Sequence, residues 1–175
     1  MQENIKINNK LIGPGEPTFV IAEISGNHGG EIENAIKLID KAKSIGADAV
    51  KLQTYTADTI TLDSQKQDFL IPAGNAWEDS RTLYSLYTDA YTPWEWHERL
   101  FNHAKQIDIE IFSSPFDDTA VDFLESLKVP MYKIASPEIF DIQLLKKVAS
   151  TGKPVILSTG LACLDDIDLA IKTLK

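Results

Sequence analysis

The feature that most constrains the fold is an alternation of short β-branched runs with longer segments of helical periodicity. The runs are too short to be helices and are apolar on both parities, which is typical of parallel strands buried on both faces. They span residues 18–25, 49–55, 109–115, 131–136 and 154–160. The helical segments between them cover residues 31–46, 92–106, 117–128 and 141–152. This alternation indicates parallel βα units joined by right-handed crossovers.

Capping residues mark where several of these helices are expected to begin. Thr92 is the expected N-cap of the second helix, and Glu95 completes a capping box with it. Asp117 or Asp118 is the expected cap of the third helix, and Asp141 that of the fourth. These signals agree with the helix limits that the periodicity predicts.

Two architectures can be built from such units, a doubly wound open sheet and a (β/α)8 TIM barrel. No GxGxxG motif follows the first strand, so the dinucleotide-binding open sheet loses its main support. Barrel enzymes build their sites from residues at the carboxyl ends of the strands. Polar residues stand at those positions throughout, namely Glu23, Gln53, Ser114, Ser136 with Glu138, and Ser158 with Thr159. The pattern therefore favours the barrel.

The number of units is smaller than a closed barrel needs. A barrel has eight βα units in about 250 residues, whereas this chain of 175 residues provides about the first five. No linker or change of composition marks a second domain. We therefore expect residues 1–175 to be the N-terminal portion of a barrel, in a sequence that is cut short.

Composition excludes several classes of function. The net charge of -9 argues against non-specific binding to nucleic acid or to anionic membranes. No apolar run approaches the ~20 residues of a membrane span, and the first ten residues lack a signal core, so a cytoplasmic location is expected. Cys163 is the only cysteine, which rules out an internal disulfide, and it is interpreted as a small buried apolar residue.

Residues 56–91 form a connection that is too long for an ordinary βα loop. Such excursions usually carry function. The mixture of aromatic and polar residues suits a lid over a ligand, and a packed decoration with a short helix at 80–88 is an equal alternative. Trp77 in this segment is interpreted as a packing residue rather than as a platform for a sugar.

Two lysines interrupt apolar strands, Lys51 in the second and Lys133 in the fourth. A buried, unpaired ammonium group costs several kcal/mol, so each lysine is expected to face an anion. Strand alternation places Lys51 and Gln53 on one face, and the two lysines could converge in the mouth of a barrel. The serines at strand ends would add hydroxyl donors for a phosphate or carboxylate ligand. The alternative is an internal salt bridge of each lysine with Glu23 or Glu138.

Five ordered motifs resemble the N-terminal barrel half of the sialic acid synthase family. They are FVIAEISGNHGG, GADAVKLQTY, FSSPFD, YKIASPEI and ILSTGLA, and the resemblance extends from about residue 11 to the end. Enzymes of that family condense phosphoenolpyruvate with an amino sugar to form a nonulosonic acid. Within the family, residues 81–97 resemble the pseudaminic acid synthases more than the N-acetylneuraminate synthases. The resemblance thus implies pseudaminic acid as the product, made from 2,4-diacetamido-2,4,6-trideoxy-altrose.

The resemblance also implies roles for individual residues. Lys51 and Lys133 would hold phosphoenolpyruvate, and hydroxyls would bind its carboxylate and phosphate. Glu23 would bind sugar hydroxyls, and Gln53 would line the same cavity. Glu138 is the candidate for proton handling or stabilisation of an oxocarbenium ion. The hydroxyls are those of Ser114, Ser136 and Ser158. The remaining substrate-binding candidates are Asn27 and His28 in the turn after the first strand, and His28 could equally stabilise the turn.

Other parts of such an enzyme are expected outside this chain. The family uses a divalent metal, manganese or magnesium, whose histidine ligands belong to later strands. A C-terminal antifreeze-like domain that completes the partner's site in a homodimer is also absent. His97 and His103 lie about 240° apart on a helix, so they are interpreted as ordinary helix residues.

Three alternatives to this function stay open at the level of sequence. One is a related synthase that makes N-acetylneuraminate or legionaminate. Another is a Schiff-base aldolase with Lys133 as nucleophile. The third is a truncated chain that binds or pairs without turnover.

Overall fold

The computed structural model describes residues 4–175, apart from the side chain of Glu78, and its centre is a parallel sheet. The strands are hydrogen-bonded in chain order. They are β3 (Ile21–Glu23), β4 (Ala49–Thr54), β5 (Glu110–Pro115), β6 (Tyr132–Ile134) and β7 (Val155–Leu157). Each lies inside one of the five predicted strand segments, so the predicted α/β class and the five βα units are confirmed. The observed strands are shorter than predicted because pairing stops where the chain turns away.

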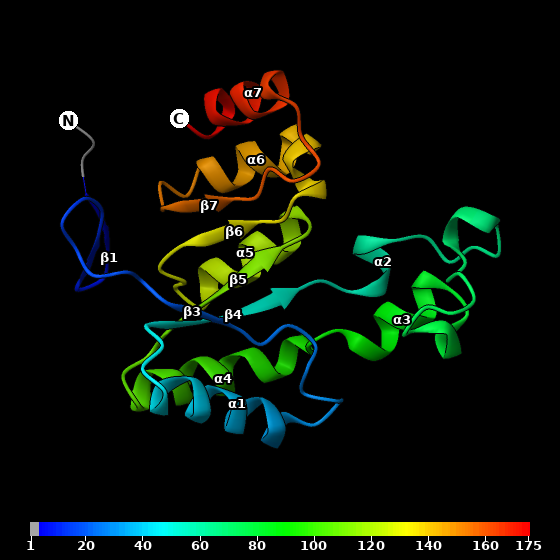
Figure 1. The fold of residues 1–175 in the computed structure, drawn as a ribbon, viewed down its shortest axis with the longest axis horizontal. Helices are drawn as coiled ribbons and strands as arrows, with labels where there is room; N and C mark the ends of the chain where they lie inside the picture. The colour runs from blue at the N-terminus through cyan, green and yellow to red at the C-terminus, as the bar shows by residue number, and fades with distance from the viewer. Residues whose placement is uncertain (1–3) are drawn as a thin grey trace.

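A helix follows each strand along the chain. These helices are α1 (Ile32–Ser44), α4 (Trp94–Gln106), α5 (Asp118–Ser126), α6 (Ile142–Ala149) and α7 (Leu164–Leu174). Figure 1 shows α1 and α4 beside one end of the sheet and α6 and α7 beside the other. The side chains of Asp117 and Asp141 accept hydrogen bonds from backbone N–H groups in the first turns of α5 and α6. The predicted cap at Asp141 is confirmed, and Asp117 rather than Asp118 is the cap of α5.

The outer face of the sheet forms the main core. Val50 and Leu52 of β4 pack against buried residues of α1 and α4, such as Ile39 and Leu100. Tyr132 and Ile134 of β6 pack in the same way against α5 and α6. Because strand residues alternate between faces, this packing directs the odd-numbered residues of β4 and β6 to the inner face.

An N-terminal hairpin covers the inner face of the sheet near the starts of the strands. Its strands β1 (Ile5–Ile7) and β2 (Lys10–Ile12) pair antiparallel. Ile7 is buried against Ala49, Phe112 and Met131, which are inward residues near the starts of their strands. Figure 1 shows the hairpin at the end of the sheet opposite to α2 and α3. This hairpin was not predicted, although alternating apolar residues around Asn8 and Asn9 are a hairpin signal.

The long connection after β4 projects beyond the carboxyl ends of the strands (Figure 1). It contains α2 (Ala57–Ile60), α3 (Leu83–Ala90) and the 3-10 turns η1 (Gln67–Phe69) and η2 (Glu78–Ser80). The short helix predicted at 80–88 therefore exists, shifted by two to three residues toward the C-terminus. A further 3-10 turn, η3 (Pro137–Phe140), follows β6.

Several local predictions are wrong. The N-cap of α4 is Pro93 and not Thr92, whose hydroxyl is instead 3.1 Å from Nε2 of His28. Cys163 is exposed rather than buried, because it precedes α7 at the open end of the sheet. The edge strands β3 and β7 are only half-buried, since no neighbouring strand covers their outer edges. Trp77 is 58% exposed, so it is not the packing residue that was expected.

No helix within the described part of the chain is both long and apolar enough to span a lipid bilayer.

Candidate functional site

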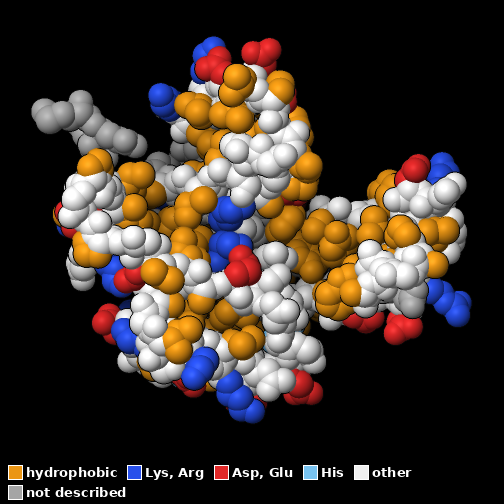
Figure 2. All heavy atoms as spheres, viewed as in Figure 1, with side chains coloured by type: hydrophobic (Ala, Val, Ile, Leu, Met, Phe, Trp, Pro, Cys, Tyr) orange, Lys and Arg blue, Asp and Glu red, His pale blue; other side chains and the backbone are white. Residues whose placement is uncertain are grey.

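The charged residues predicted to form a site lie on the inner face of the sheet, between the apolar cluster around Ile7 and the carboxyl ends of the strands. Glu23 is paired in register with Lys51, and Gln53 with Ser114. Lys133 lies on the inward side of β6, opposite to the side that packs on the helices. Figure 2 shows basic side chains next to an acidic one at the centre of this face, bordered by apolar surface. Residues from different strands thus form one polar site at the carboxyl end of the sheet.

Lys51 has a protein partner within this site. Its ammonium group forms an ion pair with the carboxylate of Glu23, and the Lys51 side chain is 12% exposed while that of Glu23 is 44% exposed. This is the salt bridge that was considered as the alternative to an anion site. The Glu23 side chain stays partly exposed to solvent in this pair, so its carboxylate can still accept hydrogen bonds from a ligand.

Lys133 differs from Lys51 because it forms no ion pair with the other residues that the structure describes. Its Nζ donates a 2.9 Å hydrogen bond to the carbonyl of Ile134, the next residue along the strand. Burial lowers the pKa of Lys133, and the positive charge of Lys51 lowers it further, against the smaller effects of Glu23 and Glu138. The two ammonium groups are therefore close enough to repel each other, and a bound anion would relieve both.

Glu138 in η3 supplies a carboxyl group whose surroundings favour the protonated form. Burial raises its pKa, although the charge of Lys133 acts in the opposite direction. Its Oε2 is buried and has no hydrogen-bond partner within the described residues. A buried oxygen without a partner is costly and rare in native proteins, and it indicates a group that meets a ligand or water.

The strand-end serines differ in their roles. Ser114 is buried on the inner side of β5, where 2% of its surface is exposed. The hydroxyl oxygen of Ser136 accepts a 2.8 Å hydrogen bond from the backbone N–H of Leu161, which ties η3 to the loop after β7. Ser158 lies in that loop, half-buried, and its N–H continues the ladder by donating to the carbonyl of Ile134. Ser114 and Ser158 thus remain the hydroxyls that could meet a ligand.

The turn after β3 holds Asn27 and His28 in different environments. Asn27 is exposed, and its side-chain amide donates to the carbonyl of Ile24. His28 is 1% exposed, its Nδ1 accepts from the N–H of Gly30, and its Nε2 bonds Thr92. Burial lowers the pKa of His28, which favours the neutral ring. This geometry favours the turn-stabilising role for His28 over direct substrate contact.

A buried polar network behind the site was missed at the level of sequence. His97 of α4 is fully buried, and its Nε2 lies 2.9 Å from Oγ1 of Thr54 at the end of β4. Thr54 in turn lies 2.7 Å from Oγ of Ser113 on β5. His97 lies in a helix as expected, and its burial in this network is a feature that the helical spacing did not indicate. The network fixes the strand ends that carry Gln53 and Ser114. The sequence signal for it was a further polar residue beside each of these candidates, Thr54 beside Gln53 and Ser113 beside Ser114.

The described residues do not provide a metal site. No group of three or more His, Cys, Asp or Glu side chains within residues 4–175 has the arrangement to hold an ion. The manganese or magnesium that the resemblance implies therefore has no ligand set here, and we assign no chemical step to it.

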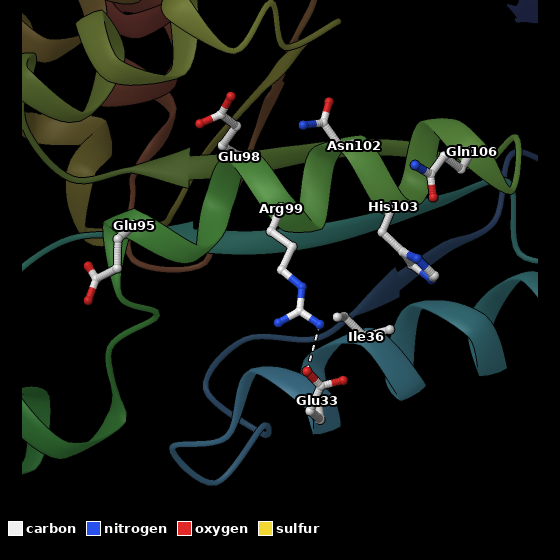
Figure 3. Close-up of a pocket in the computed structure, with 8 residues that line it drawn as sticks. All are labelled: Glu33, Ile36, Glu95, Glu98, Arg99, Asn102, His103 and Gln106. Carbon is white, nitrogen blue, oxygen red and sulfur yellow. Dashed lines mark hydrogen bonds and ion pairs between the residues drawn. The ribbon is translucent and has the colours of Figure 1, made fainter.

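One sizeable cavity lies away from this site. It is a groove of about 520 Å³ between α1 and α4, lined mainly by polar residues such as Glu95 and Asn102. Figure 3 shows Arg99 reaching across it to Glu33, at 2.6 Å. This ion pair is more than half exposed on both sides, so it contributes little to stability. The groove is a polar seam between two outer helices, and it contains none of the candidate site residues.

Known proteins resemble this chain in sequence and in structure. A family model described as the NeuB family matches residues 38–175. The chain is 47% identical to a pseudaminic acid synthase of Helicobacter pylori, over 89% of this chain and 45% of that protein. It is 39% identical to an N,N'-diacetyllegionaminic acid synthase of Legionella pneumophila, over 100% of this chain and 49% of that one. The structure of an N-acetylneuraminic acid synthetase from Leptospira borgpetersenii superposes with a TM-score of 0.82 at 31% identity, over 98% of this chain and 55% of that one. The chain thus spans about half the length of the relatives that it matches.

Proposed function

Because this chain belongs to the NeuB family, we propose that it forms the phosphoenolpyruvate-binding part of a nonulosonate synthase. The observation that carries the proposal is the juxtaposition of Lys133, a half-buried ammonium without a carboxylate partner, and Glu138, a half-buried carboxyl whose Oε2 is buried without a partner among the described residues. An anion beside Lys133 and a proton on Glu138 would satisfy both groups. This combination suits a substrate that carries a phosphate and changes its protonation during the reaction.

The proposed reaction joins phosphoenolpyruvate to the open-chain form of an acylated amino sugar. C3 of phosphoenolpyruvate attacks the aldehyde carbon, a new C–C bond forms, and the aldehyde oxygen takes up a proton. Water adds at C2, and phosphate then leaves with cleavage of its C–O bond. Atoms balance, since phosphoenolpyruvate, sugar and water yield nonulosonic acid and phosphate.

The residues of this chain take part in binding and proton transfer. Lys133 and Lys51 hold the phosphate and carboxylate of phosphoenolpyruvate, with hydroxyl donors from Ser114 and Ser158. Glu23 remains exposed enough beside Lys51 to accept hydrogen bonds from sugar hydroxyls. Glu138 is the proton donor or acceptor, because its raised pKa places its titration nearer to neutral pH than that of an ordinary carboxyl.

We further propose that the sugar is a 2,4-diacetamido-2,4,6-trideoxy hexose and the product pseudaminic acid. Support comes from the higher identity to the Helicobacter pylori pseudaminic acid synthase, 47%, than to the legionaminic acid synthase, 39%. The whole enzyme would also use a divalent metal and act as a homodimer.

A chimera tests this function. Residues 11–175 of this chain would replace the matching half of the Helicobacter pylori enzyme, and phosphate release and product would be measured with both the diacetamido sugar and N-acetylmannosamine. We expect turnover of the diacetamido sugar and its loss on Lys133→Met. Comparable turnover of N-acetylmannosamine would overturn the sugar assignment, and an inactive chimera that folds and binds no phosphoenolpyruvate would overturn the function. Borohydride trapping of a covalent adduct at Lys133 would instead support the aldolase.

A further inference from the structure

A second cavity adjoins the proposed site at the base of the projecting connection. It encloses about 280 Å³ between the turn after β3 and the segment around α3. Gly26 and Asn27 in its wall come shortly after Glu23, and Tyr55 comes two residues after Gln53. The volume lies just below the ~300–1,000 Å³ typical of pockets that enclose a whole small ligand. A substituent of the sugar fits this size better than a complete second substrate.

Packing holds the walls of this cavity in place. The ring of Tyr55 makes edge contacts with those of Tyr87 and Phe116, at centroid distances of 5.5 and 5.4 Å. Gly26 approaches α3 so closely that an added Cβ would lie 2.4 Å from the carbonyl oxygen of Ala90. Burial raises the pKa of Tyr55 to about 12, so its hydroxyl stays protonated. The cavity is therefore preformed and not a gap in a loose loop.

The lining determines which chemistry can bind. The side chains of Trp77, Leu86 and Ala90 offer apolar surface, and Trp77 is 58% exposed. Asp89 offers a carboxylate that has no hydrogen bond or ion pair with the other described residues. Among the described residues, no lysine or arginine lines the cavity. These side chains offer no positive charge to a phosphate or carboxylate, whereas a neutral group with a methyl and an N–H donor suits both surfaces.

We propose that this cavity binds an acetamido group of the amino sugar, with its methyl on Trp77 and its N–H donated to Asp89. The inference rests on the proposed function, and it adds a specificity pocket that is separate from the lysine site. The sugar's reacting aldehyde would then lie toward Glu23 and Lys133, and the acetamido group would lie under the connection. Sugars without an acylated nitrogen would lose both contacts.

Saturation-transfer NMR on the chimera tests this pocket, with N-acetylmannosamine and mannose as probes. We expect saturation to concentrate on the acetyl methyl and mannose to give no signal. Trp77→Ala and Asp89→Ala should each weaken N-acetylmannosamine binding at least fivefold. Asp79→Asn is the control, because Asp79 is exposed nearby but does not line the cavity. Equal binding of mannose, or unchanged affinity in both alanine variants, would overturn the pocket.

The test separates the pocket from the function on which it rests. Phosphoenolpyruvate binding to the chimera should be unchanged by Trp77→Ala and lost with Lys133→Met. If the acetyl sugar fails to bind while the chimera still binds phosphoenolpyruvate, the pocket is wrong and the synthase stands. If acetyl-sugar binding depends on Trp77 while phosphoenolpyruvate is not bound, the pocket stands and the synthase is wrong.

Discussion

Glu23 and Lys51 lie directly opposite each other in the register of β3 and β4, and their charged groups form an ion pair at the carboxyl end of the sheet. This pair distinguishes the two lysines of the site. Lys51 already has a counter-ion, whereas Lys133 has only the carbonyl of Ile134. An incoming anion therefore gains more from Lys133 than from Lys51, because it does not compete there with a protein carboxylate.

The first prediction follows from this difference. In the chimera, Lys133→Met should weaken phosphoenolpyruvate binding at least tenfold relative to wild type. The loss for Lys51→Met should be smaller. Stability should be unchanged or increased, because a desolvated ammonium group is removed. Calorimetric titration and urea unfolding measure the two effects. Lys172→Met on the exposed side of α7 is the control, and an equal or smaller loss at Lys133 would contradict the ranking.

The second prediction concerns pH and His97. Burial lowers the pKa of His97 from 6.5 to about 4. Between these values the unfolded chain binds a proton that the folded protein excludes, so the free energy of unfolding decreases as pH falls from 6.5 to 4. The loss at this site amounts to up to about 3 kcal/mol. Urea unfolding across this range should show that the free energy of unfolding falls less steeply with decreasing pH for His97→Gln than for wild type, and an equal pH dependence in the two proteins would contradict the assignment to His97.

The third prediction tests the polar network at Thr54. Thr54→Val leaves the ring nitrogen of His97 and the hydroxyl of Ser113 without this partner. We expect a loss of about 1–3 kcal/mol in the free energy of unfolding, the cost of buried polar groups without hydrogen bonds. Thr88→Val is the matched control, because that hydroxyl is exposed and bonds only the carbonyl of Tyr84. A cost at Thr54 no larger than at Thr88 would show that the network does not contribute.

The fourth prediction compares two glycines. In Gly26→Ala the new methyl would lie 2.4 Å from the carbonyl oxygen of Ala90, so backbone must move. We expect about 1–3 kcal/mol of destabilisation and weaker N-acetylmannosamine binding, since this contact forms a cavity wall. In Gly160→Ala the methyl meets only the Ser136 hydroxyl at 3.6 Å, an ordinary contact. Thermal unfolding should separate the two variants clearly, and equal midpoints would refute the close approach.

The fifth prediction concerns a polypeptide of these 175 residues on its own. β3 and β7 are the terminal strands of the described sheet, and apolar side chains such as Leu161 and Leu164 are exposed near β7. Open edges with apolar neighbours promote pairing between chains. We expect self-association in light scattering and no phosphate release from phosphoenolpyruvate with the sugar, even with added manganese. An active monomer would contradict the interpretation of the sheet as part of a barrel.

The main elements and many of the candidate site residues are predictable from the sequence. Periodicity identified the five strands and their helices, because alternation and helical period are local properties of the chain. The sequence also marked Lys51, Lys133 and Glu138, since a charged group among apolar neighbours is visible without coordinates. The caps at Asp117 and Asp141 were found for the same reason.

The pairing of these groups depends on the three-dimensional fold. The ion pair of Lys51 with Glu23, the orphaned oxygen of Glu138 and the burial of His97 all depend on residues distant in sequence. The exposure of Trp77 and the cavity beside it depend on how the connection folds back on the turn after β3. Local sequence patterns cannot predict these contacts, because burial and pairing depend on strand register and on which elements cover each face of the sheet.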